Sequence, residues 1–289
     1  MKNLYFLLCS IAFILSSCAQ EFQEKSNSTQ KPLPLAKFNS VSDFLDTFDY
    51  LANLRFEELK LWVKTNNFDS SIYKSESIQD TLFRDTPIAF QALFNTNLEV
   101  QIGESIITYS NGELYSITKN GNIYDKKNYG YAKYDEDSSH QPSTRYSGTS
   151  IHGDKQSSRQ HEFGINANNY HYKYIHQIRS FTTVINTQTR YALVLDIKME
   201  YKNSGSWKSA GRERTIEYNL NSSCSFGVER GENLYFKTNI PIHYSDGYAN
   251  IVLFSAKSKA LNNRWVYTLT GTVTQEIVGS PESRWIDNF

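Results

Sequence analysis

Five of the six histidines lie close together in the sequence, between residues 140 and 176. Imidazole groups with nearby carboxylates form the ligand sets of many zinc and copper sites. No two of these histidines have a spacing that makes them converge, and His171 and His176 project from opposite faces of a strand. We therefore interpret the group as polar loop and strand residues and predict no cofactor. His161, His171 and His176 stay as weak candidates for metal ligands.

Tyrosines are frequent in the same stretch of the chain. Exposed tyrosine rings beside polar groups can bind a glycan or a peptide, because the ring offers an apolar face and the hydroxyl a hydrogen bond. The alternative is that alternate residues such as Tyr172 and Tyr174 pack one face of a sheet. The candidate ligand-binding residues predicted from the sequence are Tyr146, Tyr170, Tyr172 and Tyr174.

The known catalytic motifs that the chain resembles are incomplete. His161 and Glu162 begin like a zinc-protease helix, but Ile165 stands where that motif needs its second histidine. Ser150 follows Gly148 as in a nucleophile elbow, yet the second glycine comes one residue late, and a polar loop precedes the motif instead of a strand. No catalytic residue is predicted. These failures favour a non-enzymatic protein, with an enzyme as the open alternative.

A different chemistry is indicated at the N-terminus. The apolar run from Leu4 to Leu15 follows Lys2 and is too short to cross about 30 Å of hydrocarbon, which takes about 20 helical residues. It is typical of a secretory signal. The next residues, Leu15-Ser16-Ser17-Cys18, resemble the lipobox of bacterial lipoproteins. That resemblance implies cleavage after residue 17 and acylation of the Cys18 sulfur with palmitate-type chains. A plain signal peptide with an incidental cysteine is the alternative.

The expected location follows from this anchor. Two acyl chains hold a protein stably at a bilayer, whereas one does so only marginally. We expect a lipid-anchored protein of the bacterial cell envelope, at the outer membrane, with the periplasmic or surface face left open. Residues 18–38 are polar and contain two prolines, which predicts a flexible tether. The chain has 30 basic and 30 acidic residues, so no net charge attracts it to nucleic acid.

The three cysteines agree with this interpretation. Cys9 leaves with the signal and Cys18 carries lipid, so Cys224 has no partner for an intrachain disulfide. A free cysteine in an oxidising compartment is tolerated when it is buried, where it behaves as a small hydrophobe. We therefore predict a buried Cys224, with a catalytic thiol as the alternative.

The folded part is expected to begin with helices and a β-meander. Apolar residues recur at three- and four-residue steps from Val41 to Val63, which predicts an amphipathic helix that Ser40 or Ser42 can cap and Asn53 can divide. A second, short helix is predicted at Thr86-Pro87. From residue 98 the apolar period changes to two, and the pairs Asn111-Gly112 and Asn120-Gly121 are strong hairpin signals. A meander over residues 98–125 is therefore expected.

This region resembles a known kind of protein. The order of helices, a short Pro-led helix, and the stretch from Asn95 to Ile117 containing LEVQIGESI is similar to uncharacterised lipoprotein domains of Bacteroidetes-type envelopes. The resemblance covers about a third of the chain. Because those domains have no established activity, it implies an envelope lipoprotein and no particular chemistry.

The pattern of the rest of the chain predicts antiparallel strands that follow one another with short turns between them. The clearest covers residues 190–202, with Tyr191, Leu193 and Leu195 on an apolar face and Asp196 and Lys198 on a face expected to be wet. The fold class is therefore α+β, mainly β, with a small helical region and meander followed by an antiparallel β-sandwich-like domain. The predicted divisions are a signal peptide (1–17), a tether (18–38), a helical and meander region (39–128), a Tyr- and His-rich polar loop (129–160) and the β domain (161–289).

Two functions remain open at this level. The favoured one is a non-enzymatic binding or structural module of the cell envelope, with a glycan or peptide as possible ligand. The alternative is an envelope hydrolase acting on glycan or peptide. A deep pocket containing two carboxylates, or a serine with a histidine, would favour the hydrolase.

Overall fold

A computed structural model describes residues 34–73, 78–120, 123–134, 143–144, 158–165, 170–235, 242–244, 248–257 and 264–289. Pro34–Phe289 forms one compact unit. The predicted signal peptide, Cys18 and most of the tether lie outside the described residues. Within the described ranges, no helix is both long enough and apolar enough to cross a membrane.

Short helices open the folded unit. Ser40 caps the first of them by accepting a hydrogen bond from the Asp43 amide at 3.1 Å. The predicted division at Asn53 is confirmed, because this residue ends one helix and Arg55 begins the next. The Thr86-Pro87 signal precedes a helix of only four residues. The helical elements are α2 (Val41–Ala52), α3 (Phe56–Thr65), a 3-10 turn (Ser71–Tyr73), α4 (Thr81–Arg84) and α5 (Ile88–Gln91).

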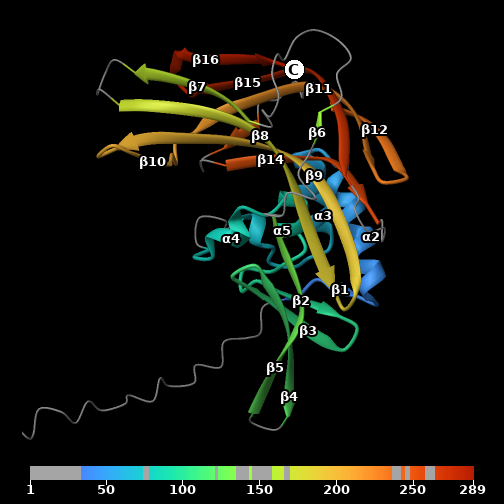
Figure 1. Cartoon of the computed structure of the whole chain (residues 1–289). Coiled ribbons are helices and arrows are strands. Elements are labelled where there is room, and N and C mark those ends of the chain that lie inside the picture. Colours follow the sequence, from blue (N-terminus) through green and yellow to red (C-terminus); the bar gives the residue numbers. More distant parts are fainter. Residues whose placement is uncertain are drawn as a thin grey trace, which may run out of the picture. The chain divides into compact units, whose positions relative to one another are not determined.

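The larger sheet has ten strands, which pair in the order β1-β2-β3-β4-β5-β8-β9-β10, with β14 also on β9 and β7 also on β8 (Figure 1). The predicted turn at Asn111-Gly112 is confirmed, with both residues at positive φ (52° and 83°). These strands are β1 (Lys37–Phe38), β2 (Glu99–Ile102), β3 (Ser105–Ser110), β4 (Glu113–Asn120), β5 (Ile123–Tyr134), β7 (Ser158–Ile165), β8 (Tyr170–Ile185), β9 (Gln188–Asn203), β10 (Ser206–Ser209) and β14 (Tyr248–Ala256).

The smaller sheet has six strands in the order β12-β11-β15-β16, with β13 on β11 and β6 on β15. Within it, β11 pairs antiparallel with β12 and β15, and β15 pairs antiparallel with β16. Its members are β6 (Ser143–Thr144), β11 (Arg214–Phe226), β12 (Glu229–Tyr235), β13 (Ile242–Tyr244), β15 (Trp265–Ile277) and β16 (Ser280–Asn288). Strands thus dominate and helices are few, which confirms the α+β, mainly β class.

The middle of the larger sheet is covered on both faces. On one face, α2 packs against β9 and β14, α5 packs against β14, and Val194 of β9 joins their core. On the other face, Leu193 and Leu195 join a core shared with Trp265 of the smaller sheet. The expectation of a wet face for β9 is therefore wrong at its centre: Asp196 is fully buried. Two apolar layers cover this strand, so alternation no longer separates buried from exposed positions.

The larger sheet continues across the predicted boundaries at 128 and 160. Residues 130–134 of β5 pair with residues 181–185 of β8, so the meander and the later strands share one sheet. Residues 129–134, expected in the polar loop, belong to β5. The physical reason is long-range pairing: an edge of the meander gains backbone hydrogen bonds from a strand about 50 residues away, which no local pattern indicates. Residues 135–142 and 145–157 of the predicted loop lie outside the described residues.

Candidate functional site

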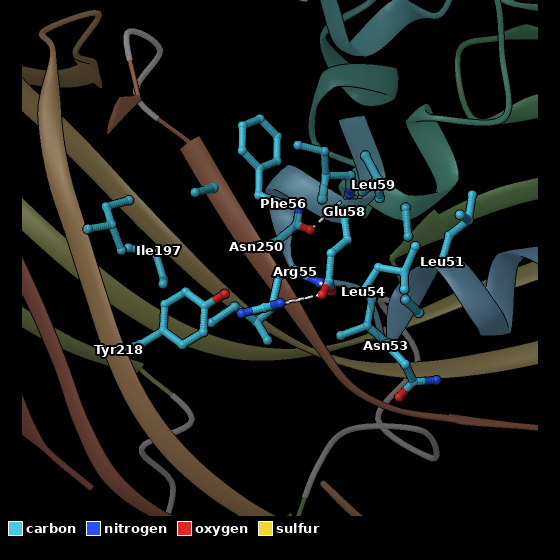
Figure 2. A pocket seen from close by; sticks show the side chains of 17 residues that line it. Leu51, Asn53, Leu54, Arg55, Phe56, Glu58, Leu59, Ile197, Tyr218 and Asn250 are labelled. Atoms are coloured by element: carbon cyan, nitrogen blue, oxygen red, sulfur yellow. Dashed lines mark hydrogen bonds and ion pairs between the residues drawn. The ribbon is translucent and has the colours of Figure 1, made fainter. Parts of the chain in front are cut away.

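A pocket of about 310 Å³ lies beside the turn between α2 and α3. Its other walls come from α5, from β9 and β14 of the larger sheet, and from β11 of the smaller one (Figure 2). Segments from residue 51 to residue 252 therefore meet here. A pocket of this size lies at the small end of the range that binds small molecules, roughly 300–1,000 Å³.

Most of the residues that line the pocket are apolar, although polar atoms form nearly half of its surface. Leu51 and Leu59 belong to the two helices, and Ile197 and Ile216 to the two sheets; each keeps about 1% of its surface exposed. Leu54 and Phe56 come from the turn and the first residue of α3. The local reason is the sequence of the turn: Asn53 stops α2, and the chain then restarts a helix within three residues. An apolar wall of this kind favours ligands with an apolar body.

An ion pair stands among the lining residues. The Arg55 guanidinium binds the Glu58 carboxylate through Nε, at 3.0 Å, and through Nη2. The Arg55 amide also donates to the second oxygen of Glu58, at 2.9 Å. These two interactions form a capping box at the N-terminus of α3, because the Glu58 side chain binds the residue that precedes the helix. Hydrogen bonds from Arg55 lower the pKa of Glu58, so it is an anion at neutral pH.

Three further polar side chains line the pocket and differ in what they bind. Asn53 donates to the Asp49 carbonyl at 2.7 Å. Asn250 is committed to the helical layer, because it accepts from the Ile88 amide at 2.9 Å and donates to the Thr86 carbonyl at 3.1 Å. The Tyr218 hydroxyl has no hydrogen bond among the described residues, and Figure 2 shows it turned toward Arg55. Burial raises the pKa of Tyr218, with Arg55 opposing this rise. A neutral phenol is therefore available inside an apolar pocket.

The described residues of the pocket lining offer apolar contacts and hydrogen bonds. Within the described ranges of the chain, the lining includes no serine, cysteine or histidine, and Glu58 is its only carboxylate. The set lacks the nucleophile with a base, or the second carboxylate, on which hydrolysis depends. The pocket can instead hold an apolar body and offer hydrogen bonds from Tyr218 and Arg55 to a polar group.

Neither Tyr172 nor Tyr174, two of the tyrosines predicted to bind ligand, lines this pocket. Tyr174 is fully buried and Tyr172 is 5% exposed, where a binding platform requires open ring faces. Both rings contact Phe163 of β7, and burial raises the pKa of Tyr174 to about 12. They pack the face of the sheet that turns toward the smaller sheet. Tyr146 and the side chain of Tyr170 lie outside the described residues.

The three candidate histidines do not converge. His171 is exposed, and His176 on the opposite face of β8 is 1% exposed. The Nδ1 of His176 lies 2.7 Å from Oδ2 of Asp287, and its Nε2 lies 2.9 Å from Nε2 of Gln275. His161 stacks on Trp285. In the described part of the chain, no group of three His, Cys, Asp or Glu side chains could hold a metal ion.

Cys224 lies in β11 and is 3% exposed, as predicted. It belongs to the apolar core between the two sheets. Burial raises the pKa of its thiol to about 12. The thiolate is therefore scarce near neutral pH, and a thiol of this kind is inert rather than nucleophilic.

A second cluster of polar residues was not found from the sequence. Asp196 of β9 is fully buried and forms an ion pair with Nε of Arg179 from β8. The hydroxyls of Tyr134 and Tyr248 both contact its Oδ1, and Arg179 Nη2 donates to Tyr248 at 2.8 Å. Burial raises the pKa of Asp196, and Arg179 opposes this rise. No local signal joins these residues, which come from strands β5, β8, β9 and β14.

The sequence also did not indicate the pocket. Arg55 and Glu58 stand three residues apart at the start of a helix, which is a common surface pair. Tyr218 is one of 20 tyrosines and sits in an ordinary strand pattern. Only the convergence of the α2–α3 turn with β11 gives these residues a common role.

Comparisons with known proteins add little to this geometry. No family model matches the sequence, and no curated protein matches it. Among solved structures, the chain is similar to a DUF4848 family protein from Bacteroides thetaiotaomicron, at 11% identity and a TM-score of 0.21. The match covers 87% of this chain and 95% of that chain. At that TM-score the likeness supports no conclusion about fold or function.

Proposed function

We propose that this chain is a non-enzymatic, lipid-anchored binding protein of the bacterial cell envelope, and that it binds a small amphipathic molecule in the pocket beside the α2–α3 turn. The lipobox-like Cys18 supports the anchor. The pocket supports binding, because apolar walls with a few polar groups are the usual composition of small-molecule sites. The envelope hydrolase stays the less favoured alternative, since the pocket lining supplies no nucleophile with a base.

The observation that carries the proposal is the state of Tyr218. A tyrosine hydroxyl both donates and accepts hydrogen bonds, and one that no protein group occupies is open to a ligand. The Tyr218 hydroxyl has no such partner among the described residues, although its ring is packed in the wall of a pocket. A ligand with a polar group would satisfy it, and its apolar part would cover the surrounding leucines and isoleucines.

Binding can be tested with the Pro34–Phe289 chain, which contains the whole compact unit. We expect the neutral fluorophore N-phenyl-1-naphthylamine to bind saturably, with a rise in its emission. Ile251→Trp places a large ring among the pocket-lining residues and should abolish that rise. The matched control is Ile106→Trp, at an exposed strand residue that does not line the pocket. Equal titrations for both variants and the parent chain would reject the pocket as the binding site.

The anchor is tested on the full chain in a bacterial host. Cells fed an alkyne-labelled palmitate should label the protein and carry it in the membrane fraction. Cys18→Ala should remove both the label and the membrane association, whereas Cys224→Ala should retain both. Labelling that survives Cys18→Ala would show that Cys18 is not the acylated residue.

A further inference from the structure

We infer that the ligand of this pocket is a monocarboxylate with an apolar tail, bound by the free edge of the Arg55 guanidinium and the Tyr218 hydroxyl. The inference rests on the proposed binding function and adds the chemical class of the ligand. It follows from which hydrogen-bonding groups around the pocket already have partners and which do not.

Two lining side chains use their acceptors within the protein, Glu58 and Asn250. Both oxygens of Glu58 accept hydrogen bonds from Arg55, one from the side chain and one from the backbone amide. The Asn250 oxygen accepts from the Ile88 amide. A cationic ligand that approached Glu58 would meet the adjacent Arg55 charge and be repelled by it.

The donors are only partly used. Arg55 directs Nε and Nη2 toward Glu58, and in the described part of the chain its Nη1 binds no protein group. The Arg55 side chain is 60% exposed, so a ligand can reach it. The Tyr218 hydroxyl is the second free donor. A carboxylate matches this pair, because it accepts several hydrogen bonds and pairs strongly with guanidinium.

The Glu58 charge limits this interaction and gives a sharp test. Glu58 neutralises Arg55 and would also repel an incoming carboxylate. Removing its charge should therefore strengthen the binding of an anionic ligand while leaving a neutral ligand of the same length unaffected. Most substitutions in a binding site weaken binding, so a gain in affinity that depends on ligand charge is diagnostic of this arrangement.

The experiment uses decanoate and decanol as competitors of the neutral fluorophore, below the concentrations at which either aggregates. Decanoate should bind roughly tenfold more tightly than decanol, since hydrogen bonds that involve charged groups are about twice as strong as neutral ones. Arg55→Gln should remove that preference, and Tyr218→Phe should reduce it severalfold. Glu58→Gln should increase it. The matched control is Arg284→Gln, which breaks an exposed ion pair with Glu276 that does not line the pocket.

The outcomes separate the two proposals. If the fluorophore does not bind saturably, the binding function itself is rejected. If decanol and decanoate compete equally, and Arg55→Gln and Glu58→Gln leave the decanoate titration unchanged, the pocket binds ligand but the carboxylate inference is overturned. Circular dichroism of each variant shows whether a lost signal reflects lost folding.

Discussion

Two clusters in this molecule contain the same three kinds of side chain in opposite circumstances. One joins Arg179, Asp196 and Tyr248 beneath the helical layer, where the carboxylate is fully buried and the arginine is 22% exposed. The other joins Arg55 and Glu58 with Tyr218, and there the arginine is 60% and the carboxylate 41% exposed. In the first cluster each residue binds several of the others. In the second, the tyrosine and one edge of the arginine bind none of the described residues.

The difference shows that a perturbed carboxyl group is a poor guide to function in this protein. Perturbed pKa values concentrate at active sites, but buried structural ion pairs perturb them as well. Asp196 has its pKa raised by burial, yet its hydrogen-bonding capacity is filled by Arg179, Tyr134 and Tyr248. What separates the pocket from the buried cluster is whether hydrogen-bonding groups are free to bind a ligand, and not whether a pKa is shifted. Four predictions test this comparison, from the largest expected effect to the smallest.

The largest effect is expected from removing the buried carboxylate. Asp196→Ala leaves the Arg179 charge largely buried without its partner, which should cost about 3–5 kcal/mol in the free energy of unfolding. Urea denaturation measures this. The double variant Asp196→Leu/Arg179→Met should recover much of the loss, because no unpaired charge remains. A single variant within 1 kcal/mol of the parent would show that the cluster is not structural.

The next prediction compares two tyrosine hydroxyls directly. Tyr248→Phe removes hydrogen bonds to Asp196 and Arg179 and should cost about 2 kcal/mol in the free energy of unfolding, the usual value for bonds to charged groups. Tyr218→Phe should change it by no more than about 0.5 kcal/mol, since that hydroxyl has no partner in the described chain. Urea denaturation of the two variants in parallel is the measurement. Equal losses would contradict the distinction between the clusters.

A third effect depends on pH and concerns a buried imidazole between the sheets. Burial lowers the pKa of His176 below its ordinary 6.5, although Asp287 opposes this shift; Arg214 and Arg159 contribute to it. As the pH falls below about 6.5, the unfolded chain binds a proton that the folded chain does not, so folding should weaken by up to about 1.4 kcal/mol per pH unit. The slope should flatten below the pKa of the folded state.

Urea midpoints measured across that pH range check the histidine prediction. His171→Gln should retain the slope contributed by His176, because His171 is exposed. His176→Gln should lose that contribution. A slope that is the same in both variants would assign the pH dependence to other groups.

The smallest effect is kinetic and concerns the buried thiol. In the Pro34–Phe289 chain Cys224 is the only cysteine, so an alkylating reagent reports on it alone. Its burial and its pKa of about 12 predict almost no reaction with iodoacetamide at neutral pH in the folded chain, and rapid reaction in concentrated urea. Mass spectrometry follows the labelled fraction. Rapid labelling without denaturant would place Cys224 among the available groups rather than the buried ones.

Local structure was predictable where a backbone signal is strong. Ser40 begins a helix and Asn53 ends it, as their side chains predict, and Asn111-Gly112 forms a turn because both residues tolerate positive φ. The mainly β class followed from apolar alternation along the second half of the chain. The predictions of exposure failed where a strand is covered by packed residues on both of its faces. Asp196 was expected on a wet face and is buried. Tyr172 and Tyr174, the candidate ligand-binding residues, are buried as well, which agrees with the alternative that they pack one face of a sheet.

By itself, then, the sequence predicted the break between α2 and α3, the Asn111-Gly112 turn and many of the strands, because these depend on interactions between residues a few positions apart. It also predicts the lipid anchor, a local motif that precedes the described residues. The tertiary structure alone decided that both faces of β9 are covered and that Arg55 lies beside Tyr218, about 160 residues later in the chain. Such convergence depends on how layers pack, and packing is set by the sum of many weak apolar contacts rather than by a pattern at any one position.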